Sequence, residues 1–224
     1  MDSRSDRQLG DFIKGRFLFI ESYCQKNGLD YARTRDAVKA EALRLAALPE
    51  RVRFLDEAVF GAGVLSSAHL PDWVDAVFLE AMTVALKGPG APLFTTTSRF
   101  PCITFEAGRF NAHRQSETVF RAYFTGKKPG DWLLHTFHNI YRQCYGEEAA
   151  QKFTAEEISP GHGLVTLDNR GLAKSGKMDC STTVGYLYGS MEKLGATDIL
   201  VTHHTCGAGS SVSPILCVFE VTWK

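Results

Sequence analysis

The sequence predicts an α+β fold, with helices dominating the first half of the chain and antiparallel strands joining them in the second half. In the first half, apolar residues recur at helical spacing, as at Phe12, Ile13, Phe17 and Ile20. In the second half, two pairs of short β-rich segments are each separated by a glycine-containing turn or loop. With 44% hydrophobic and 22% charged residues, the 224-residue chain has the composition of a globular protein.

Four helices are expected in the first half, because each apolar-periodic segment is bounded by residues that begin or end helices. Asn27 and Gly28 end the first, and Pro49 stops the second. Pro71 suits the first position of the fourth, which a Gly-Pro-Gly break at 88–90 follows. The expected helices span residues 7–27, 30–48, 52–60 and 71–87.

The second half mixes helices with strands. Residues 93–105 are rich in Thr and Phe, and they predict an edge strand or two short pieces, because Pro101 interrupts them. The break near residue 90 divides a helical part (1–90), suited to dimerisation, from a ligand-binding α+β part (91–224). Further helices are expected over 116–124, 131–145 and 181–194, and strands over 153–158, 164–167, 199–204 and 215–223.

The charge balance argues against nucleic-acid and membrane partners. Lys+Arg and Asp+Glu both number 25, so the formal net charge is zero, and nothing attracts the chain to phosphates or anionic lipid. The N-terminal stretch has no apolar core of the signal-peptide kind, and no apolar run approaches the roughly 20 residues of a membrane span. A cytoplasmic location is therefore expected, where the six cysteines stay reduced.

Three of those cysteines predict a metal site. Cys180 lies at the start of an expected helix, where the helix dipole favours a thiolate. Cys206 ends one expected strand and Cys217 opens the next, so a hairpin would bring the two together. Zinc prefers four such ligands, and the fourth is left open among His204, His203 and Glu157. The alternative is that these are ordinary buried core cysteines, which suits Cys217 within its apolar strand.

Other residues are candidates for ligand binding. His135 and His138 lie three apart on an expected helix and share a face, so with Trp132 they can line a pocket, hold a haem iron or bind a metal. The alternative is that they are helix histidines beside a core aromatic residue. Tyr186, in the last expected helix, is the fourth candidate for the ligand pocket.

The last third of the chain resembles the 4-vinyl-reductase domain family. The resemblance rests on Cys180, the Gly185-Tyr186 step, the strand at 199–201 leading to Cys206, and Cys217 in the closing strand, and it covers about residues 150–224. That family includes sensory domains of activators that respond to aromatic compounds. Its fold is shared distantly with haem-based nitric-oxide sensors and Golgi tethering subunits.

The resemblance implies a structural zinc held by Cys180, Cys206 and Cys217, with Glu157 as the fourth ligand. It also implies a cytosolic small-molecule-binding or sensory protein with an apolar or aromatic ligand, a homodimer formed through the helices, and a downstream protein partner. Two histidines precede Cys206, so His204 is an alternative to the carboxylate. Haem is a second cofactor that the sequence leaves open.

Two other functions stay open. One is an enzyme or accessory factor, either a tetrapyrrole-related reductase or a cysteine-dependent hydrolase, although catalysis is not the main expectation. The other is a tethering or scaffolding subunit without a ligand. A closed metal site would favour the structural role, whereas an open coordination position would favour catalysis.

Overall fold

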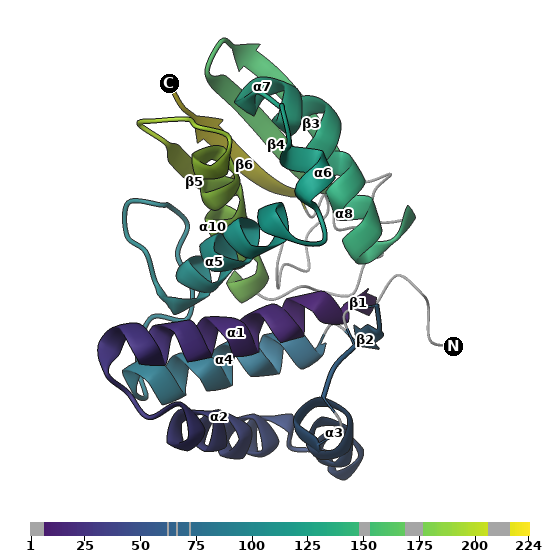
Figure 1. The fold of residues 1–224 in the computed structure, drawn as a ribbon, viewed down its shortest axis with the longest axis vertical. Coiled ribbons are helices and arrows are strands. Elements are labelled where there is room, and N and C mark those ends of the chain that lie inside the picture. The colour runs from purple at the N-terminus through teal and green to yellow at the C-terminus, as the bar shows by residue number, and fades with distance from the viewer. Residues whose placement is uncertain are drawn as a thin grey trace.

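The structure is a computed structural model in which a helical lobe and a mixed lobe lie end to end (Figure 1). It describes residues 7–61, 63–65, 67–71, 73–147, 153–168, 177–205 and 216–224. The expected α+β fold class is confirmed, because helices are combined with a four-stranded antiparallel sheet. The lobes resemble the two expected parts of the chain, but the boundary near residue 90 stays a prediction. Among the described residues, no helix has both the length and the apolarity to cross a membrane.

The helical lobe is built from the described residues between 7 and 87, and its helices follow the expected ones except at two places. Residues 7–9 form a strand instead of a first helical turn, and Pro71 ends the strand that pairs with them instead of opening the fourth helix. The capping residues explain the boundaries: the Asp30 side chain accepts a hydrogen bond from the Arg33 backbone N–H at 3.0 Å, and Pro49 opens the short third helix. The elements are β1 (Arg7–Leu9), α1 (Gly10–Asn27), α2 (Tyr31–Ala46), α3 (Pro49–Phe54), the π-helical segment η2 (Leu55–Gly61), β2 (His69–Pro71) and α4 (Trp73–Lys87).

The strand expected over residues 93–105 is wrong. Helix α5 (Ile103–Glu117) begins directly after the Pro101-Cys102 step, and residues 93–102 contribute only the isolated bridge between Thr97 and Thr202. Helix α5 is central: Ile103 belongs to the core of the helical lobe, whereas Phe105 belongs to the core of the mixed lobe. Burial on both sides therefore overrides the β propensity of its first residues.

The mixed lobe contains one sheet whose inner face is covered by helices. Its strands have the order β3-β4-β6-β5, and every neighbouring pair is antiparallel. Alternate residues such as Val165, Cys217, Phe219 and Val221 are buried, as strand periodicity requires. The strands are β3 (Phe153–Ser159), β4 (His162–Asp168), β5 (Leu200–Thr205) and β6 (Leu216–Thr222), and the helical segments are α6 (Arg121–Phe124), α7 (Pro129–Asp131), η3 (Trp132–Thr136), α8 (Phe137–Tyr145) and α10 (Lys177–Lys193).

Helices α5 and α10 approach each other at backbone distance because glycines lie between them. A Cβ added to Gly108 would lie 2.1 Å from the Thr182 carbonyl oxygen, and one added to Gly185 would lie 2.0 Å from that of Phe105. Gly189 is similarly restricted by the backbone of Arg109. The pair is the most extensive helix contact in the described chain. The mixed lobe is thereby attached to the helix that also completes the core of the helical lobe.

We predict that Gly185→Ala destabilises the protein by at least about 1–3 kcal/mol, the usual cost of overpacking a core, because the obstructing atom is backbone and cannot rotate away. Urea unfolding of the wild type and of Gly185→Ala measures the difference in the free energy of unfolding. Gly130→Ala is the matched control, since its nearest neighbour would lie at an ordinary 3.7 Å. Equal stability of the two variants would contradict the proposed close approach.

Candidate functional site

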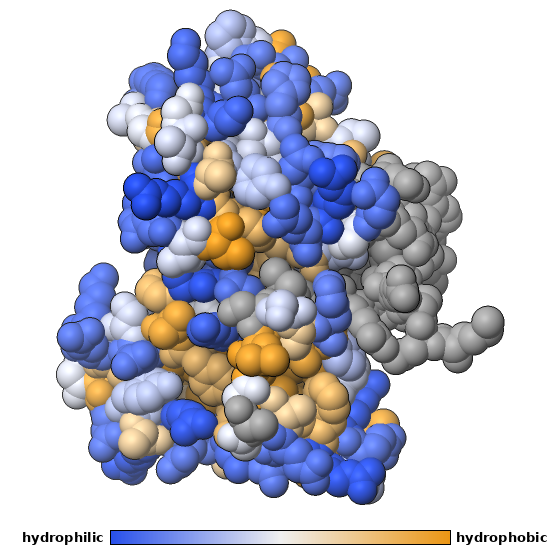
Figure 2. Space-filling model, turned by 45° about the vertical axis from the view of Figure 1, so that its right-hand side comes forward, coloured by the Kyte–Doolittle hydropathy of each residue, from blue (hydrophilic) through white to orange (hydrophobic). Residues whose placement is uncertain are grey.

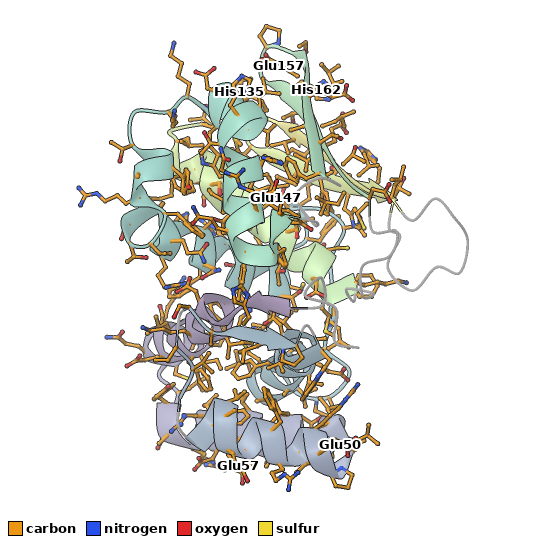
Figure 3. The ribbon with its side chains drawn as sticks, turned by 90° about the vertical axis from the view of Figure 1, so that its right-hand side faces the viewer. Glu50, Glu57, His135, Glu147, Glu157 and His162 are labelled. Atoms are coloured by element: carbon orange, nitrogen blue, oxygen red, sulfur yellow. The ribbon has the colours of Figure 1, made fainter. Side chains whose placement is uncertain are left out.

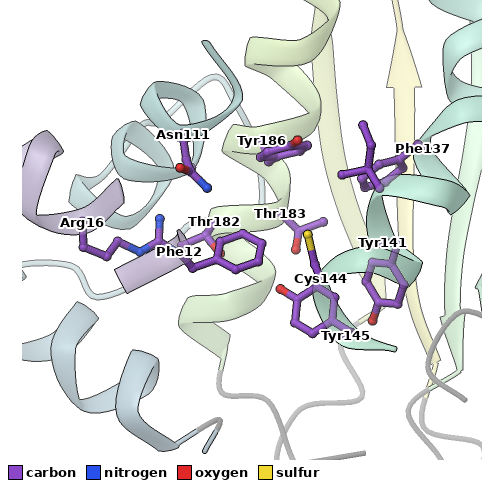
Figure 4. Close-up of a pocket in the computed structure, with 12 residues that line it drawn as sticks. Phe12, Arg16, Asn111, Phe137, Tyr141, Cys144, Tyr145, Thr182, Thr183 and Tyr186 are labelled. Atoms are coloured by element: carbon purple, nitrogen blue, oxygen red, sulfur yellow. The ribbon is translucent and has the colours of Figure 1, made fainter. Parts of the chain in front are cut away.

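A small cavity lies where helices α1, α5, α8 and α10 converge, at the junction of the two lobes (Figure 4). Its volume is about 40 Å³. Apolar residues gather on the surface around this junction, while polar residues cover the outer ends of the molecule (Figure 2). The lining residues are Phe12, Arg16, Gly108, Asn111, Phe137, Ile140, Tyr141, Cys144, Tyr145, Thr182, Thr183 and Tyr186.

One side of the cavity is aromatic and uncharged. Tyr145 packs against both Phe12 and Tyr141, with ring centroids 5.7 and 4.6 Å apart. Burial raises the pKa of Tyr141, Tyr145 and Tyr186 above that of an exposed phenol. Burial also raises the pKa of the Cys144 thiol, so this cysteine is a neutral lining residue and not a reactive thiolate.

The opposite side carries a buried ion pair. The Arg16 Nε and Nη2 atoms donate hydrogen bonds of 3.2 and 3.1 Å to the two carboxylate oxygens of Asp75, and both side chains are almost fully buried. Arg16 comes from α1 and Asp75 from α4. The remaining nitrogen, Nη1, is buried and has no hydrogen-bond partner.

Asn111 is held beside this pair by a second charged network. Its Oδ1 atom accepts hydrogen bonds from Nη2 and Nε of Arg114, at 2.8 and 3.2 Å, and Arg114 is in turn paired with Asp11. The Gln115 amide also donates to Asp11, at 2.7 Å. Because Arg114 occupies Oδ1, the orientation of the Asn111 amide is set, and its Nδ2 atom is left buried without an acceptor.

Three residues that line the cavity each carry a buried polar atom that has no hydrogen-bond partner among the protein's own groups. The atoms are Arg16 Nη1, Asn111 Nδ2 and the hydroxyl oxygen of Tyr186. The three residues are 2%, 1% and 7% exposed, respectively. Buried polar groups are normally hydrogen-bonded, because each unsatisfied one costs about 1–3 kcal/mol.

A second cluster lies under the sheet of the mixed lobe, where Cys180, His203 and Cys217 meet. One ligand atom of each lies within 4.8 Å of those of the other two, and all three residues are buried. The two sulfur atoms are 3.6 Å apart, close to the roughly 3.8 Å that tetrahedral coordination by zinc imposes at about 2.3 Å per Zn–S bond. The donor set of two thiols and an imidazole is one that zinc accepts.

The imidazole at this cluster belongs to His203, one of the three candidates that the sequence offers for the fourth ligand. His203 lies on β5 and stacks on Phe219, with ring centroids 4.4 Å apart, and its Nε2 atom is buried without a hydrogen-bond partner. Strand alternation explains the choice, because Val201 and His203 face inward while His204 is exposed. The alternation of apolar residues was the sequence signal that could have identified it.

The other expected metal ligands are placed elsewhere or not described. Cys206 lies outside the described residues. His204 points to the outer face, where its Nε2 atom lies 2.5 Å from Glu220. Glu157 is on β3, and Figure 3 shows it at the end of the mixed lobe farthest from the helical lobe. The structure thus brings Cys180 and Cys217 together with His203, and the expected roles of the others stay predictions.

Of the four expected ligand-binding residues, Tyr186 lines the cavity. Trp132 is fully buried one layer behind it, stacked on Phe137 with ring centroids 5.1 Å apart. His138 packs beside Phe153, outside the lining. His135 is exposed at the end of the mixed lobe farthest from the helical lobe (Figure 3). Trp132, His135 and His138 therefore do not line a common pocket.

The fold is that of H-NOX (haem NO/oxygen-binding) proteins. A single-residue mutant of T. tengcongensis H-NOX has 14% identity and a TM-score of 0.57, with 96% of this chain and 97% of that chain covered. A structure from a study of heme distortion in the H-NOX family has 15% identity and a TM-score of 0.58, with 95% of this chain and 93% of that chain covered. An oxygen-binding H-NOX domain related to soluble guanylate cyclases, in its oxygen complex, has 14% identity and a TM-score of 0.55, with 96% of this chain and 92% of that chain covered.

These likenesses establish the fold alone and correct the expected family. No known protein family and no curated protein matches the sequence. The resemblance to the 4-vinyl-reductase family is wrong, because the structural similarity to H-NOX proteins extends over nearly the whole chain and not only over its last third. The short pattern of glycines, cysteines and strands from Cys180 onward reflects a helix followed by a hairpin, a local arrangement that does not identify a family.

A haem does not fit the cavity that the described residues form. A volume of about 40 Å³ is far below the roughly 300–1,000 Å³ of pockets for drug-sized ligands, because aromatic rings of α1, α8 and α10 fill the space. No histidine or methionine lines it. Its possible iron ligands by type, Cys144 and the three tyrosines, have a raised pKa and so favour the protonated form.

We predict that the protein, expressed in haem-sufficient cells and then purified, shows no Soret absorption band near 400 nm. The reason is the filled cavity and the absence of an imidazole from its described lining. An absorption spectrum with a pyridine haemochrome assay measures it. A stoichiometric haem would contradict the present description of the cavity.

We predict that Asp75→Ala destabilises the fold by about 3–5 kcal/mol, because the Arg16 guanidinium would stay buried without its counter-charge. The double variant Arg16→Met/Asp75→Leu should recover most of the loss, since both charges are then absent. Chemical denaturation of the single and double variants checks this. If the single and the double variant lose the same stability, Arg16 and Asp75 do not act as a coupled pair.

A pH dependence is expected from Glu220 on the outer face of the sheet. Hydrogen bonds from His204 and then His162 hold the pKa of this carboxylate below its ordinary value of 4.5. A depressed folded-state pKa contributes stability that is present above 4.5 and is lost as the pH falls through the folded pKa. Glu220→Gln should therefore show a smaller loss of stability between about pH 5 and pH 3 than the wild type, as measured by thermal unfolding.

Proposed function

We propose that this protein is a small-molecule-binding protein of the sensory kind, with its ligand in the interlobe cavity. The observation that carries the proposal is a cavity between apolar rings, three of whose lining residues carry buried polar atoms without a partner among the protein's own groups. Similarity in fold to proteins described as haem NO/oxygen-binding supports a ligand-binding role, although the chemistry of this cavity differs from a haem site.

The position of the cavity suits a sensor. Phe12 and Arg16 reach it from the helical lobe, while residues of α8 and α10 reach it from the mixed lobe. A ligand that contacts both lobes favours the conformation in which those contacts are best, and so shifts the equilibrium between arrangements of the lobes. A downstream protein partner and a homodimer formed through the helices stay predictions within this proposal.

We also propose a structural zinc at Cys180, His203 and Cys217. Such an ion would join α10 to β5 and β6, the two strands at one edge of the sheet. Three ligands and one further position complete a tetrahedron. Cys206, three residues beyond His203, is one of the three expected cysteine ligands, and we propose it for that position. Burial of the three described ligands supports a closed structural site over a catalytic one.

The alternatives receive less support. A cysteine-dependent hydrolase would need an accessible nucleophile and a base oriented by an acid, but Cys180 is 5% exposed and the described cluster contains no carboxylate. A tethering subunit without a ligand would have no reason to keep three unpartnered polar groups around a cavity. A tetrapyrrole-related reductase would need far more space than the cavity offers.

A screen of compounds with about three to five non-hydrogen atoms tests the ligand proposal. We predict that at least one chemical class raises the melting temperature and shifts the NMR signals of cavity residues. Cys144→Leu should abolish that response, because the added side-chain volume fills the cavity. A response that survives in folded Cys144→Leu protein would place the ligand elsewhere, and the absence of any response would overturn the proposal.

Metal analysis of untagged protein tests the zinc proposal. We predict about one zinc per chain, lost in Cys180→Ser, Cys217→Ser and His203→Ala together with thermal stability. Cys24→Ala is the control, since Cys24 lies in the core of the helical lobe. Cys206→Ser separately tests the fourth ligand. Zinc-free wild-type protein, or folded variants that keep their zinc, would overturn the site.

A further inference from the structure

We infer that the ligand of the interlobe cavity is a small carboxylate with a short apolar tail, recognised by Arg16, Asn111 and Tyr186. This inference rests on the proposed ligand-binding function and names the chemical class of the ligand. Figure 4 shows Arg16 and Asn111 entering from α1 and α5, across the cavity from Tyr141, Cys144 and Tyr145 of α8.

The first argument is the sign of the unmet hydrogen-bonding capacity. Arg16 Nη1 and Asn111 Nδ2 can only donate, and the Tyr186 hydroxyl can donate as well. No Asp or Glu belongs to the described lining of the cavity. A group that satisfies several donors at once must be rich in acceptors, and a carboxylate has two oxygens with about four lone-pair sites. An amine or another cation would find no carboxylate in the described lining to pair with.

The second argument is that the donors are held in place before any ligand arrives. Two hydrogen bonds to Asp75 leave the Arg16 guanidinium one orientation, with Nη1 as its remaining donor group. Arg114 occupies Oδ1 of Asn111 and so prevents the amide from turning its oxygen toward the cavity. Groups held in this way lose little conformational freedom on binding, which favours affinity for a small ligand.

The third argument is the balance of charge and size. Asp75 and Asp11 already neutralise Arg16 and Arg114, so a bound carboxylate depends on charge-assisted hydrogen bonds more than on net attraction. About 40 Å³ is room for roughly three waters, which matches acetate or propionate and excludes a ring. Phe12, Phe137 and Ile140 supply the apolar surface for the tail.

Titration with acetate and propionate, beside acetamide and propionamide, tests the inference. The amides have nearly the same shape, but they carry no charge and replace one acceptor oxygen with a donor. We predict saturable binding of propionate, at least about tenfold tighter than that of propionamide, since hydrogen bonds to charged groups are the stronger ones. NMR titration at constant ionic strength and neutral pH measures both affinities.

Two conservative variants assign the contacts. Asn111→Asp keeps the shape and the acceptor for Arg114 but replaces the donor with a negative charge, so it should weaken propionate binding by at least about tenfold. Tyr186→Phe removes only the hydroxyl and should weaken binding by severalfold. Ser190→Ala is the control, because its hydroxyl is also buried and unpartnered but lies outside the cavity lining, and its affinity should equal that of the wild type.

The outcomes separate this inference from the proposed function. If propionamide or a neutral alcohol binds as tightly as propionate, the carboxylate inference is overturned and the ligand-binding function stands. If folded Asn111→Asp and Tyr186→Phe proteins bind propionate as the wild type does, the assigned site is wrong. If no compound of either class binds, the inference and the proposed function fall together.

Discussion

The close approach of helices α5 and α10 is the constraint on which the rest of the structure depends. Carbonyl oxygens of one helix occupy the positions where side chains of the other would begin at Gly108 and Gly185. At that spacing, α5 takes part in the cores of both lobes. Helix α10 places Thr182, Thr183 and Tyr186 at the junction of the lobes. The cavity exists because these backbones converge there with α1 and α8.

The charged side chains buried at this junction form ion pairs, and some of the polar atoms beside them have no partner in the protein. Buried ion pairs are weak contributors to stability, because desolvation offsets much of their attraction. The two pairs here, Arg16 with Asp75 and Arg114 with Asp11, instead determine orientation. Each pair occupies some of the polar atoms around it and leaves Arg16 Nη1 and Asn111 Nδ2, in two residues that line the cavity, without a protein partner. Such positioning is more specific than net charge, which is zero for the chain as a whole.

The two candidate sites lie in different environments and suit different tasks. The cluster of Cys180, His203 and Cys217 is enclosed by sheet and helix, as a structural ion requires. The cavity lies between the lobes, where occupancy can be transmitted to their arrangement. Both sites meet on α10, since Cys180 lies in the first turn of this helix and Tyr186 lies further along it.

The sequence by itself determined the fold class, the four strands of the larger sheet and the helix boundaries at Gly28 and Pro49, because these depend on local periodicity and capping. It also indicated that Cys180 and Cys217 would meet. Only the tertiary structure decided that residues 103–117 form a helix, that His203 and not His204 faces the two cysteines, and that Arg16 and Asn111, far apart in the chain, line one cavity. These outcomes depend on which faces are buried against distant elements, and local sequence carries no record of those contacts.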